Sequence, residues 1–377
     1  MGSVFGKNIK ISVFGESHGP AVGVVIDGLP SGFDIDFEII SKEMGRRKPT
    51  TGVYSTRRNE ADEVEILSGI NNGKTTGTPV AAIIRNTDCK SRDYDDMESL
   101  LRPGHADFSG FIRYNGYNDR RGSGHFSGRL TAPVVFAGAL AAQILNVYGI
   151  IIGSHIDSIY DAHDIRFDGT NVTKEQLFML RSMDIPVNDR SVRELYLQII
   201  EEARNNSDSV GGIIETAIIG IPAGIGSPIF DNVEARLSSI LFSIPAVKGV
   251  EFGDGFGITR LYGSEANDSF YIEDGNIYTE TNHNGGINGG ITNGMPVIFR
   301  TAVKPTSSIA KEQDTVDIKE GKNAKLKVKG RHDACIVPRA VPVIDAAAAI
   351  IVLDLFMEHY GFEGLNKGRK YNGKQES

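Results

Sequence analysis

The sequence predicts an α+β fold in which central buried helices are sandwiched between antiparallel sheets. Residues 131–148 and 342–360 are apolar on nearly every side, and helices of this kind belong in the interior of a protein. Residues 59–84 and 251–303 alternate short apolar runs with Gly, Asn and Asp turns, a pattern typical of antiparallel strands. We therefore expect the helices in the middle layer and the strands outside them.

Both central helices have the same residue types at their ends. Each follows an arginine, Arg129 or Arg339, and has a proline near its start, where a missing N–H costs nothing. Each ends at a glycine, Gly149 or Gly361, which is common just beyond a helix C-terminus.

An internal similarity indicates two pseudo-repeated halves. Residues 23–32 are a strand running into a Gly/Pro turn, and residues 212–224 repeat that order. An aspartate that suits an N-cap follows each turn, Asp36 or Asp231. A helix-like segment comes next in both cases, at 37–44 and 232–241. Chance similarity of Gly/Pro turns is the alternative explanation.

We expect one compact domain over residues 1–362. Within it, residues 151–210 are interpreted as a largely helical insertion, with helices at 174–183 and 192–204. The polar tail, 363–377, is expected to fray.

Composition limits the kind of protein. The chain of 377 residues has a formal net charge of −8, whereas nucleic-acid binding usually needs a basic surface. Two cysteines, Cys89 and Cys335, cannot build a disulfide framework, and no signal peptide is visible, so a cytoplasmic protein is expected. The apolar stretch 132–152 is interrupted by a proline and two amide side chains, which predicts a buried helix and then a strand, with no membrane span.

Two histidines lie in settings that favour proton transfer. His18 follows the predicted strand 9–14 within the Gly-rich residues 15–19, and His105 lies in residues 102–107. A histidine flanked by small residues at a strand end is easily exposed to a cleft, where it titrates near neutrality. A hydrogen-bonded structural role is the alternative for each.

Basic residues gather near Gly-rich turns although the chain is acidic. Arg46, Arg47 and Lys48 are followed by Arg57 and Arg58, and residues 102–129 contain five further arginines. Because arginine pairs with phosphate and carboxylate through its planar fork, we expect a site for small anions. A solvated basic face is the alternative.

Seven segments together resemble the chorismate synthase family over most of the chain. They occur in the family's order at 15–19, 102–107, 127–132, 246–251, 282–290, 304–308 and 330–335. The resemblance implies that family's β-α-β sandwich fold. It also implies an anti-1,4-elimination of phosphate from 5-enolpyruvylshikimate 3-phosphate, giving chorismate in the shikimate pathway to aromatic amino acids. Reduced FMN is required without net redox change, and a homotetramer is implied.

The resemblance also assigns residues to roles. His18 would protonate the departing phosphate, His105 would protonate the reduced flavin, and Asp333 would help move the substrate's hydrogen through the flavin. The implied substrate-binding residues are Arg47, Lys48, Arg57 and Arg129. The implied FMN-binding residues are His125, Phe126, Ser127, Pro245, Ala246, Gly289, Lys304, Pro305, Thr306, Ser307, Ser308 and Arg331. No metal is implied.

The chain departs from the family pattern at several positions. His125 and Phe126 stand where Arg and Ser are common in the family. Val53 stands where many members have Arg, and Pro245 stands where Asn is usual. Lys48 occupies a position where the family often has Arg. Arg57 could bind the anion that an arginine in place of Val53 would otherwise bind. None of these changes touches the three predicted catalytic residues, so an active enzyme is expected.

Two other functions remain open at this stage. One is a flavin- or phosphate-binding protein that kept the scaffold and lost turnover. The other is a metal-dependent phosphohydrolase using His105 and Asp107, although the sequence lacks CxxC and HExxH spacings. Because no Gly-x-Gly-x-x-Gly turn joins a strand to a helix, we expect an external flavin reductant and not self-reduction with NADPH.

Overall fold

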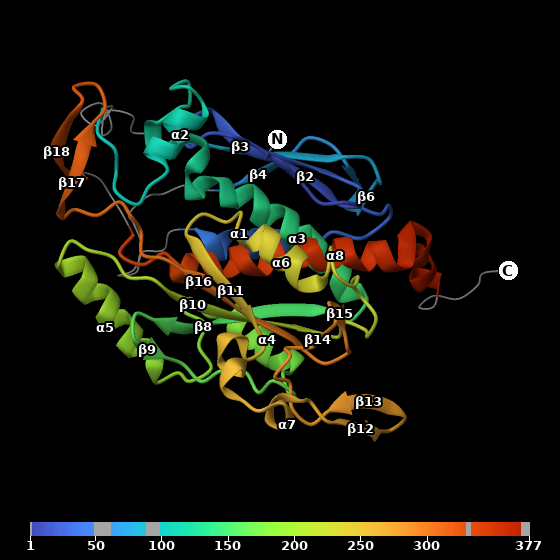
Figure 1. The fold of residues 1–377 in the computed structure, drawn as a ribbon. Coiled ribbons are helices and arrows are strands. Elements are labelled where there is room, and N and C mark those ends of the chain that lie inside the picture. Colours follow the sequence, from blue (N-terminus) through green and yellow to red (C-terminus); the bar gives the residue numbers. More distant parts are fainter. Residues whose placement is uncertain (1, 49–61, 88–98, 329–332, 371–377) are drawn as a thin grey trace.

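The computed structural model describes residues 2–48, 62–87, 99–328 and 333–370, without the side chains of 363 and 366–370. Two five-stranded sheets lie on either side of a layer of helices (Figure 1). The middle layer contains α1 (Phe37–Arg47), α3 (Thr131–Val147), α6 (Val233–Leu241) and α8 (Val337–Lys370). The predicted α+β sandwich is therefore confirmed.

Each half of the chain supplies one sheet. The upper sheet of Figure 1 has the order β1-β2-β3-β7-β4 and the lower sheet the order β11-β16-β10-β8-β9. The upper strands are β1 (Val4–Phe5), β2 (Lys10–Gly15), β3 (Ala21–Asp27), β4 (Val64–Ile66) and β7 (Val80–Arg85). The lower strands are β8 (Ile151–Ile159), β9 (Ala162–His163), β10 (Gly212–Ile219), β11 (Val247–Phe252) and β16 (Val297–Val303).

Four hairpins and several short helices complete the described chain. The hairpins are β5 (Ile70–Asn71) with β6 (Lys74–Thr75), β12 (Phe270–Glu273) with β13 (Asn276–Thr279), β14 (Ile287–Asn288) with β15 (Ile291–Thr292), and β17 (Glu312–Asp317) with β18 (Lys322–Lys327). The remaining α-helices are α2 (Asp107–Arg113), α4 (Lys174–Arg181), α5 (Val192–Asn205) and α7 (Gly263–Ala266).

The strand order confirms the internal repeat. In the first half, the order β2-β3-β7-β4 has α1 following β3 along the chain and α3 following β7. In the second half, β8-β10-β16-β11 has α6 following β10 and α8 following β16. The two halves therefore share one topology, and both contribute a long helix to the middle layer.

The two long helices pack closely. A methyl group at Gly138 of α3 would lie 2.3 Å from the Cα atom of Ala346 in α8, so only glycine allows this approach. Both helices are long and apolar enough to cross a membrane, but 72% of the apolar window around α3 and 94% of that in α8 is buried inside the protein. They are core helices, as predicted from their composition.

Helix ends agree with the prediction in part. Asp36 caps α1 as expected, accepting hydrogen bonds from the backbone N–H groups of Glu38 and Ile39. Asp231 does not cap α6; the neighbouring Asn232 does, and Asp231 instead forms a salt bridge with Lys7 at 2.8 Å. Adjacent Asp and Asn are equally good caps, so the local pattern could not choose between them.

The predicted boundaries at the C-terminal end were wrong. The last helix begins at Val337, before the predicted residue 342, and resumes after a break at Gly361, where φ is 69°. Residues 363–370 are helical and not frayed: Leu365 is buried, and its carbonyl accepts a hydrogen bond from the Tyr148 hydroxyl at 2.5 Å. Residues 371–377 lie outside the described chain.

The predicted insertion also begins too early. Residues 151–159 are the fully buried strand β8, in the interior of the lower sheet. The insertion follows β8 and contains α4 and α5, as predicted, on the outer side of that sheet (Figure 1).

The chain's first strands are anchored to its last helix. The carboxylate of Asp354 in α8 accepts hydrogen bonds from the backbone N–H groups of Lys7, Asn8 and Ile9, at 2.6–2.9 Å. It also pairs with Arg236 of α6. This buried carboxylate therefore joins the upper sheet to the middle layer.

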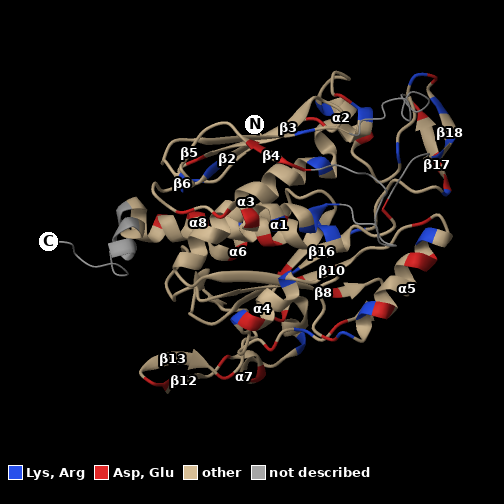
Figure 2. Cartoon of the chain, turned by 180° about the vertical axis from the view of Figure 1, so that it is seen from behind, with Lys and Arg blue, Asp and Glu red and all other residues tan. Residues whose placement is uncertain are grey.

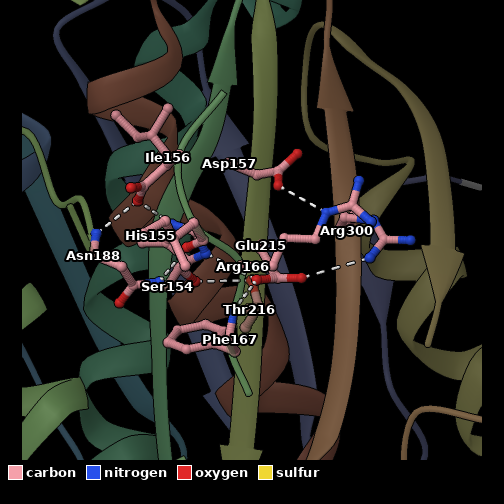
Figure 3. Close-up of polar contacts among 12 residues, drawn as sticks. Ser154, His155, Ile156, Asp157, Arg166, Phe167, Asn188, Glu215, Thr216 and Arg300 are labelled. Carbon is pink, nitrogen blue, oxygen red and sulfur yellow. Dashed lines mark hydrogen bonds and ion pairs between the residues drawn. The ribbon is translucent and has the colours of Figure 1, made fainter. Parts of the chain in front are cut away.

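Four ionisable side chains lie in a row across the lower sheet. His155, Glu215, Arg300 and Glu251 are direct cross-strand partners on β8, β10, β16 and β11, so they share one face. Figure 3 shows Glu215 between His155 and Arg300. With Asp164 we call these residues the sheet network.

His155 is fully buried at the end of this row. Its Nδ1 and Nε2 atoms each lie 2.8 Å from a carboxylate oxygen, of Asp164 and Glu215 respectively. Burial lowers the pKa of His155, but the hydrogen bonds to both carboxylates outweigh burial and raise it. Glu215 also accepts the backbone N–H of Phe167, so the network fastens the insertion to the sheet.

Candidate active site

The turn after β2 presents His18. The backbone N–H of Gly19 donates to the Glu16 carbonyl at 3.0 Å, which closes the turn. The side-chain amide of Asn86, just after β7, donates to the carbonyls of both Glu16 and Gly19. The turn is thus held on the edge of the upper sheet by a neighbouring strand end.

A loop of residues with positive φ lies against His18. Gly122, Ser123 and Gly124 have φ values of 55°, 75° and 52°, a conformation that costs most residues energy and glycine little. A methyl group at Gly122 would lie 2.3 Å from Cδ2 of His18, so the close contact also requires glycine. The Ser17 N–H donates to the Gly124 carbonyl and fixes the two segments together.

His105 is held by a carboxylate and an arginine. Its Nδ1 atom lies 2.8 Å from Oδ1 of Asp107. Arg102 binds Asp107 with both arms of its guanidinium, Nε to Oδ2 at 2.8 Å and Nη2 to Oδ1 at 2.7 Å. Burial raises the pKa of Asp107, but the bonds from Arg102 and His105 outweigh it and hold that pKa well below its usual range.

This arrangement determines which ring nitrogen of His105 can act. An ionised Asp107 only accepts hydrogen bonds, so Nδ1 of His105 carries the proton it donates there, and Nε2 takes no part in this bond. The oxygens of Asp107 are already engaged, which disfavours the metal-dependent alternative. Among the described residues, no cluster of three or more His, Cys, Asp or Glu could hold a metal ion.

The same loop connects the two histidine turns. Nη1 of Arg102 donates to the Ser123 hydroxyl at 3.1 Å, one residue beyond the glycine that contacts His18. Two turns that are 87 residues apart along the chain (105 − 18) thus meet at residues 121–126.

The implied FMN-binding residues 304–308 lie beside the turn that carries His105. Nζ of Lys304 donates to the Gly104 carbonyl at 2.8 Å, and a methyl group at Gly104 would lie 3.5 Å from Cβ of Ser307. The backbone N–H of Lys304 donates to the carbonyl of Ala246 at 2.9 Å. Burial, with the charge of Lys248, lowers the pKa of Lys304. Residues 304–308 and Ala246, both predicted to bind FMN, are therefore brought together.

The predicted substrate arginines Arg47 and Arg129 also lie together. Both contact the buried carboxylate of Asp62, Arg47 through Nη2 at 2.5 Å and Arg129 through Nη1. Arg129 also donates to the Asn86 side chain and to the Arg85 carbonyl. We call this group the Arg47–Arg129 site. In Figure 2, basic positions gather where α1 ends, between the two sheets.

Asp333, four residues before α8, lies near the Arg47–Arg129 site. Arg339 pairs with Asp333 and donates from Nε to the backbone carbonyl of Arg47 at 3.1 Å. Lys48, the residue after Arg47, lines a pocket of about 250 Å³. This pocket lies between the ends of α1 and α4 and the start of α8. Arg339 lines that pocket too.

The remaining candidates are placed less centrally. Phe126 packs against α2, with its ring 6.2 Å from that of Tyr114, and exposed His125 bonds the Gly15 carbonyl through Nδ1. Ser127 caps the 3₁₀ turn that carries Arg129.

Gly289 lies in the β14–β15 turn beside the start of α6, and none of the described contacts joins it to residues 304–308. Pro245 precedes Ala246 after α6. Arg57, Val53 and Arg331 lie outside the described residues.

Several residues that build the site were not predicted from the sequence. Asp62, Asn86, Arg102 and Arg339 hold the predicted residues. Asp62 and Asn86 are single polar residues with no pattern of their own. The pairing of Arg102 with Asp107 had a local signal, because both lie in the His105 motif.

Comparisons with known sequences and structures all match proteins of the same family. A sequence model described as chorismate synthase matches residues 9–357. The curated chorismate synthase of Thermococcus kodakarensis is 45% identical over 362 residues, covering 96% of this chain and 99% of that protein. That of Pyrococcus abyssi is 47% identical over 349 residues, covering 93% and 96%. A crystal structure of chorismate synthase matches with a TM-score of 0.76 and 29% identity, covering 97% of this chain and 98% of the other.

Proposed function

The chain belongs to the chorismate synthase family, a family of lyases in aromatic amino acid biosynthesis, and from this premise we propose how its own residues carry out the reaction. The substrate is 5-enolpyruvylshikimate 3-phosphate, which loses phosphate to give chorismate. The observation that best supports a shared site is the meeting of the His18 and His105 turns at residues 121–126.

His18 is proposed as the proton donor to the departing phosphate. It lies at a glycine-rich strand end where the Gly122 contact restricts its ring. Arg47 and Arg129 bind oxyanions of the substrate, since guanidinium groups recognise phosphate and carboxylate. Protonating the leaving group while its charge is held lowers the barrier to C–O cleavage.

His105 is proposed to hold and deliver a proton at Nε2. Asp107 fixes the tautomer, and Arg102 keeps Asp107 ionised and oriented. Asp333 is proposed to help in removing the substrate's hydrogen, and Arg339 positions it beside Arg47. His105 and Asp333 are thus each held by a second charged residue, Asp107 and Arg339.

The residues around Lys304 fit a cofactor that carries a phosphate. They combine an ammonium group with the hydroxyls of Thr306, Ser307 and Ser308 next to the small Gly104. We propose that this segment and Ala246 hold FMN. When bound in its reduced form, FMN supplies electron density that eases loss of the phosphate without net redox change.

We propose an external reductant for the flavin, a cytoplasmic location and a homotetramer. The buried thiol of Cys335, whose pKa burial raises to about 12, suits a reducing compartment.

The β12–β13 hairpin offers a surface for assembly. It projects from the lower sheet and exposes Phe270, Ile272 and Ile277 by 63–76%, an apolar surface that assembly would cover. Sedimentation of the purified chain measures the assembly.

Anaerobic turnover tests the function directly. The protein, reduced FMN and the enolpyruvyl substrate should give chorismate and phosphate. A second mixture, in which oxidised FMN and NADPH replace the reduced FMN, should give neither product. FMN binding without any product would leave only the binding-protein alternative.

Replacing His105 tests its role. His105→Ala should lower turnover about 10²–10⁴-fold, the usual contribution of one general acid, while FMN affinity stays close to that of the unmodified protein. His359→Ala, at an exposed histidine of α8, is the control. Near-normal turnover in His105→Ala would remove this residue from the mechanism.

A further inference from the structure

A short segment that leads into the turn of His105 lies along β17 of the β17–β18 hairpin (Figure 1). Leu100 forms an antiparallel bridge with Asp317. The backbone N–H of Ile318 donates to the Ser99 carbonyl at 3.0 Å. Because β17 also pairs with β18, it is the central strand of three. The hairpin therefore extends to the residues directly before the His105 turn.

One side chain of β17 holds the last peptide group of this segment. The hydroxyl of Thr315 donates to the carbonyl of Leu101. The same peptide group includes the backbone N–H of Arg102, which donates to Oδ2 of Asp107 at 2.9 Å. A peptide group is planar and rigid. The Thr315 hydroxyl and the Asp107 carboxylate therefore hold opposite ends of a single unit.

Asp107 passes the orientation of this peptide group to His105. Its Oδ1 atom lies 2.8 Å from Nδ1 of the histidine. Arg102 binds the same carboxylate with both arms of its guanidinium. Because the side chains of Arg102 and Asp107 are each only 7% exposed, neither has room to move without its partners. A rotation of the peptide group would therefore move the carboxylate and the imidazole together.

The strand that carries Thr315 continues the implied FMN-binding segment. Residues 304–308 lead directly into β17. Nζ of Lys304 donates to the carbonyl of Gly104, the residue before His105. One stretch of chain thus contacts the histidine turn at two points, through a lysine at its start and a threonine in the hairpin.

We propose that Thr315 is a positioning residue for His105 and acts through the Leu101–Arg102 peptide group and Asp107. This inference rests on the proposed role of His105 as a proton donor and adds to it a residue from the other half of the chain. The hydroxyl does not touch the reacting atoms; it holds the geometry in which the imidazole meets them. A misplacement of about 1 Å in such a group can lower turnover about 10²-fold.

Steady-state kinetics of Thr315→Val test the proposal. Valine has the same branched shape as threonine and lacks the hydroxyl. The kcat should fall about 10–10²-fold. The KM for the enolpyruvyl substrate should stay close to that of the unmodified chain, because the Arg47–Arg129 site is not touched. Thr315→Ser keeps the hydroxyl and should recover most of the lost turnover.

Asp314→Asn is the matched control on the same strand. It removes an exposed carboxylate that pairs with Lys325 of β18 and takes no part in the contacts to residues 99–101. Its kcat should equal that of the unmodified chain. If Thr315→Val does not fold, Thr315→Ala removes the same hydroxyl and takes its place.

A double-mutant cycle measures whether Thr315 acts through His105. In the His105→Ala background, Thr315→Val should lower kcat no further, because the residue that it positions is gone. A residue that only supports the fold would lower kcat by the same factor in both backgrounds.

Hydrogen exchange gives a readout that needs neither FMN nor turnover. In the chain without cofactor, Thr315→Val should raise the rate of amide exchange in residues 99–107. Strand β8 and helix α8 should exchange as in the unmodified chain. This measurement decides whether the threonine holds the turn even if the chain forms no chorismate, so failure of the proposed function and failure of this inference are distinguishable.

An unchanged kcat in Thr315→Val would overturn the proposal, as would an equal loss in Asp314→Asn. The proposal would also be overturned if Thr315→Ser recovered no turnover, if Thr315→Val lowered kcat equally with and without His105, or if exchange in residues 99–107 did not change.

Discussion

The Arg47–Arg129 site and the sheet network are both buried ionic clusters, but they are completed differently. In the sheet network, both nitrogens of His155 have carboxylate partners, and Glu215 receives a further backbone hydrogen bond. In the Arg47–Arg129 site, Asp62 contacts both arginines, and within the described part of the chain Nε of Arg47 meets no hydrogen-bond acceptor. The sheet network stabilises the fold, whereas the arginines of the other cluster are the proposed ligands of substrate anions.

The position of each cluster explains the difference. The sheet network lies across four paired strands and beneath an insertion, so any unmet charge there would destabilise the core. The Arg47–Arg129 site lies where helix ends and strand ends meet, at the end of α1 and after β7. Such ends are not fixed by a ladder of pairs and can leave donors for a bound molecule.

The largest expected effect is loss of the imidazole in the sheet network. His155→Leu leaves Asp164 and Glu215 buried near each other without their shared cation, which should cost about 3–5 kcal/mol of unfolding free energy. Turnover per folded molecule should be unchanged. Urea unfolding measures the loss, with His359→Leu as the exposed control; a stable His155→Leu with impaired turnover would reverse the roles assigned to the two clusters.

A smaller effect separates the two arginines of the site. Arg47→Gln and Arg129→Gln should each raise the KM for substrate, because each weakens anion binding by about 1.5–3 kcal/mol. Arg129→Gln should also lower the melting temperature more, because Arg129 holds the Asn86 side chain and the Arg85 carbonyl. Steady-state kinetics and thermal unfolding give both quantities. Equal destabilisation by the two variants would contradict the structural role of these Arg129 contacts.

The smallest effect is the pH dependence of the sheet network. The pKa of His155 is raised in the folded protein, so its contribution to stability is full below its ordinary pKa of 6.5 and is lost as pH rises through the folded value. The pKa of Glu215 is lowered, so its contribution is lost on acidification. The stability difference between the unmodified chain and His155→Leu should therefore shrink above neutrality. A difference that grows with pH would show that His155 is buried in its neutral form.

The sequence predicted what local patterns control. The central helices were predicted from runs of apolar residues, and the repeat was predicted from two similar strand-turn-helix orders. Both features depend on residues that are close together in the sequence. The sheet network could not be predicted, since it depends on the register of four strands from distant parts of the chain. His155 lies in a buried strand, and its neighbours in the sequence do not indicate that Asp164 and Glu215 are its partners.

The active-site prediction had the same limit. Family motifs named His18, His105 and the arginines. The residues that orient His105 lie in its own motif, but those that hold the His18 turn and the arginines come from other segments. Asp62 and Asn86 are single polar residues whose importance arises only when the turns of the upper sheet meet. Ser123 is held at a φ of 75° between two glycines, and a serine has no preference that would predict this.

The bonds from Asp354 to Lys7, Asn8 and Ile9 have a consequence for the order of folding. They join residues up to 347 positions apart, so the first strands synthesised receive their anchor only when the last helix has left the ribosome. Closing so long a loop is slow compared with local pairing. The two halves share a topology, yet we expect the first to complete its packing only together with the second, and a nascent chain that stops before α8 to leave its apolar core surface exposed.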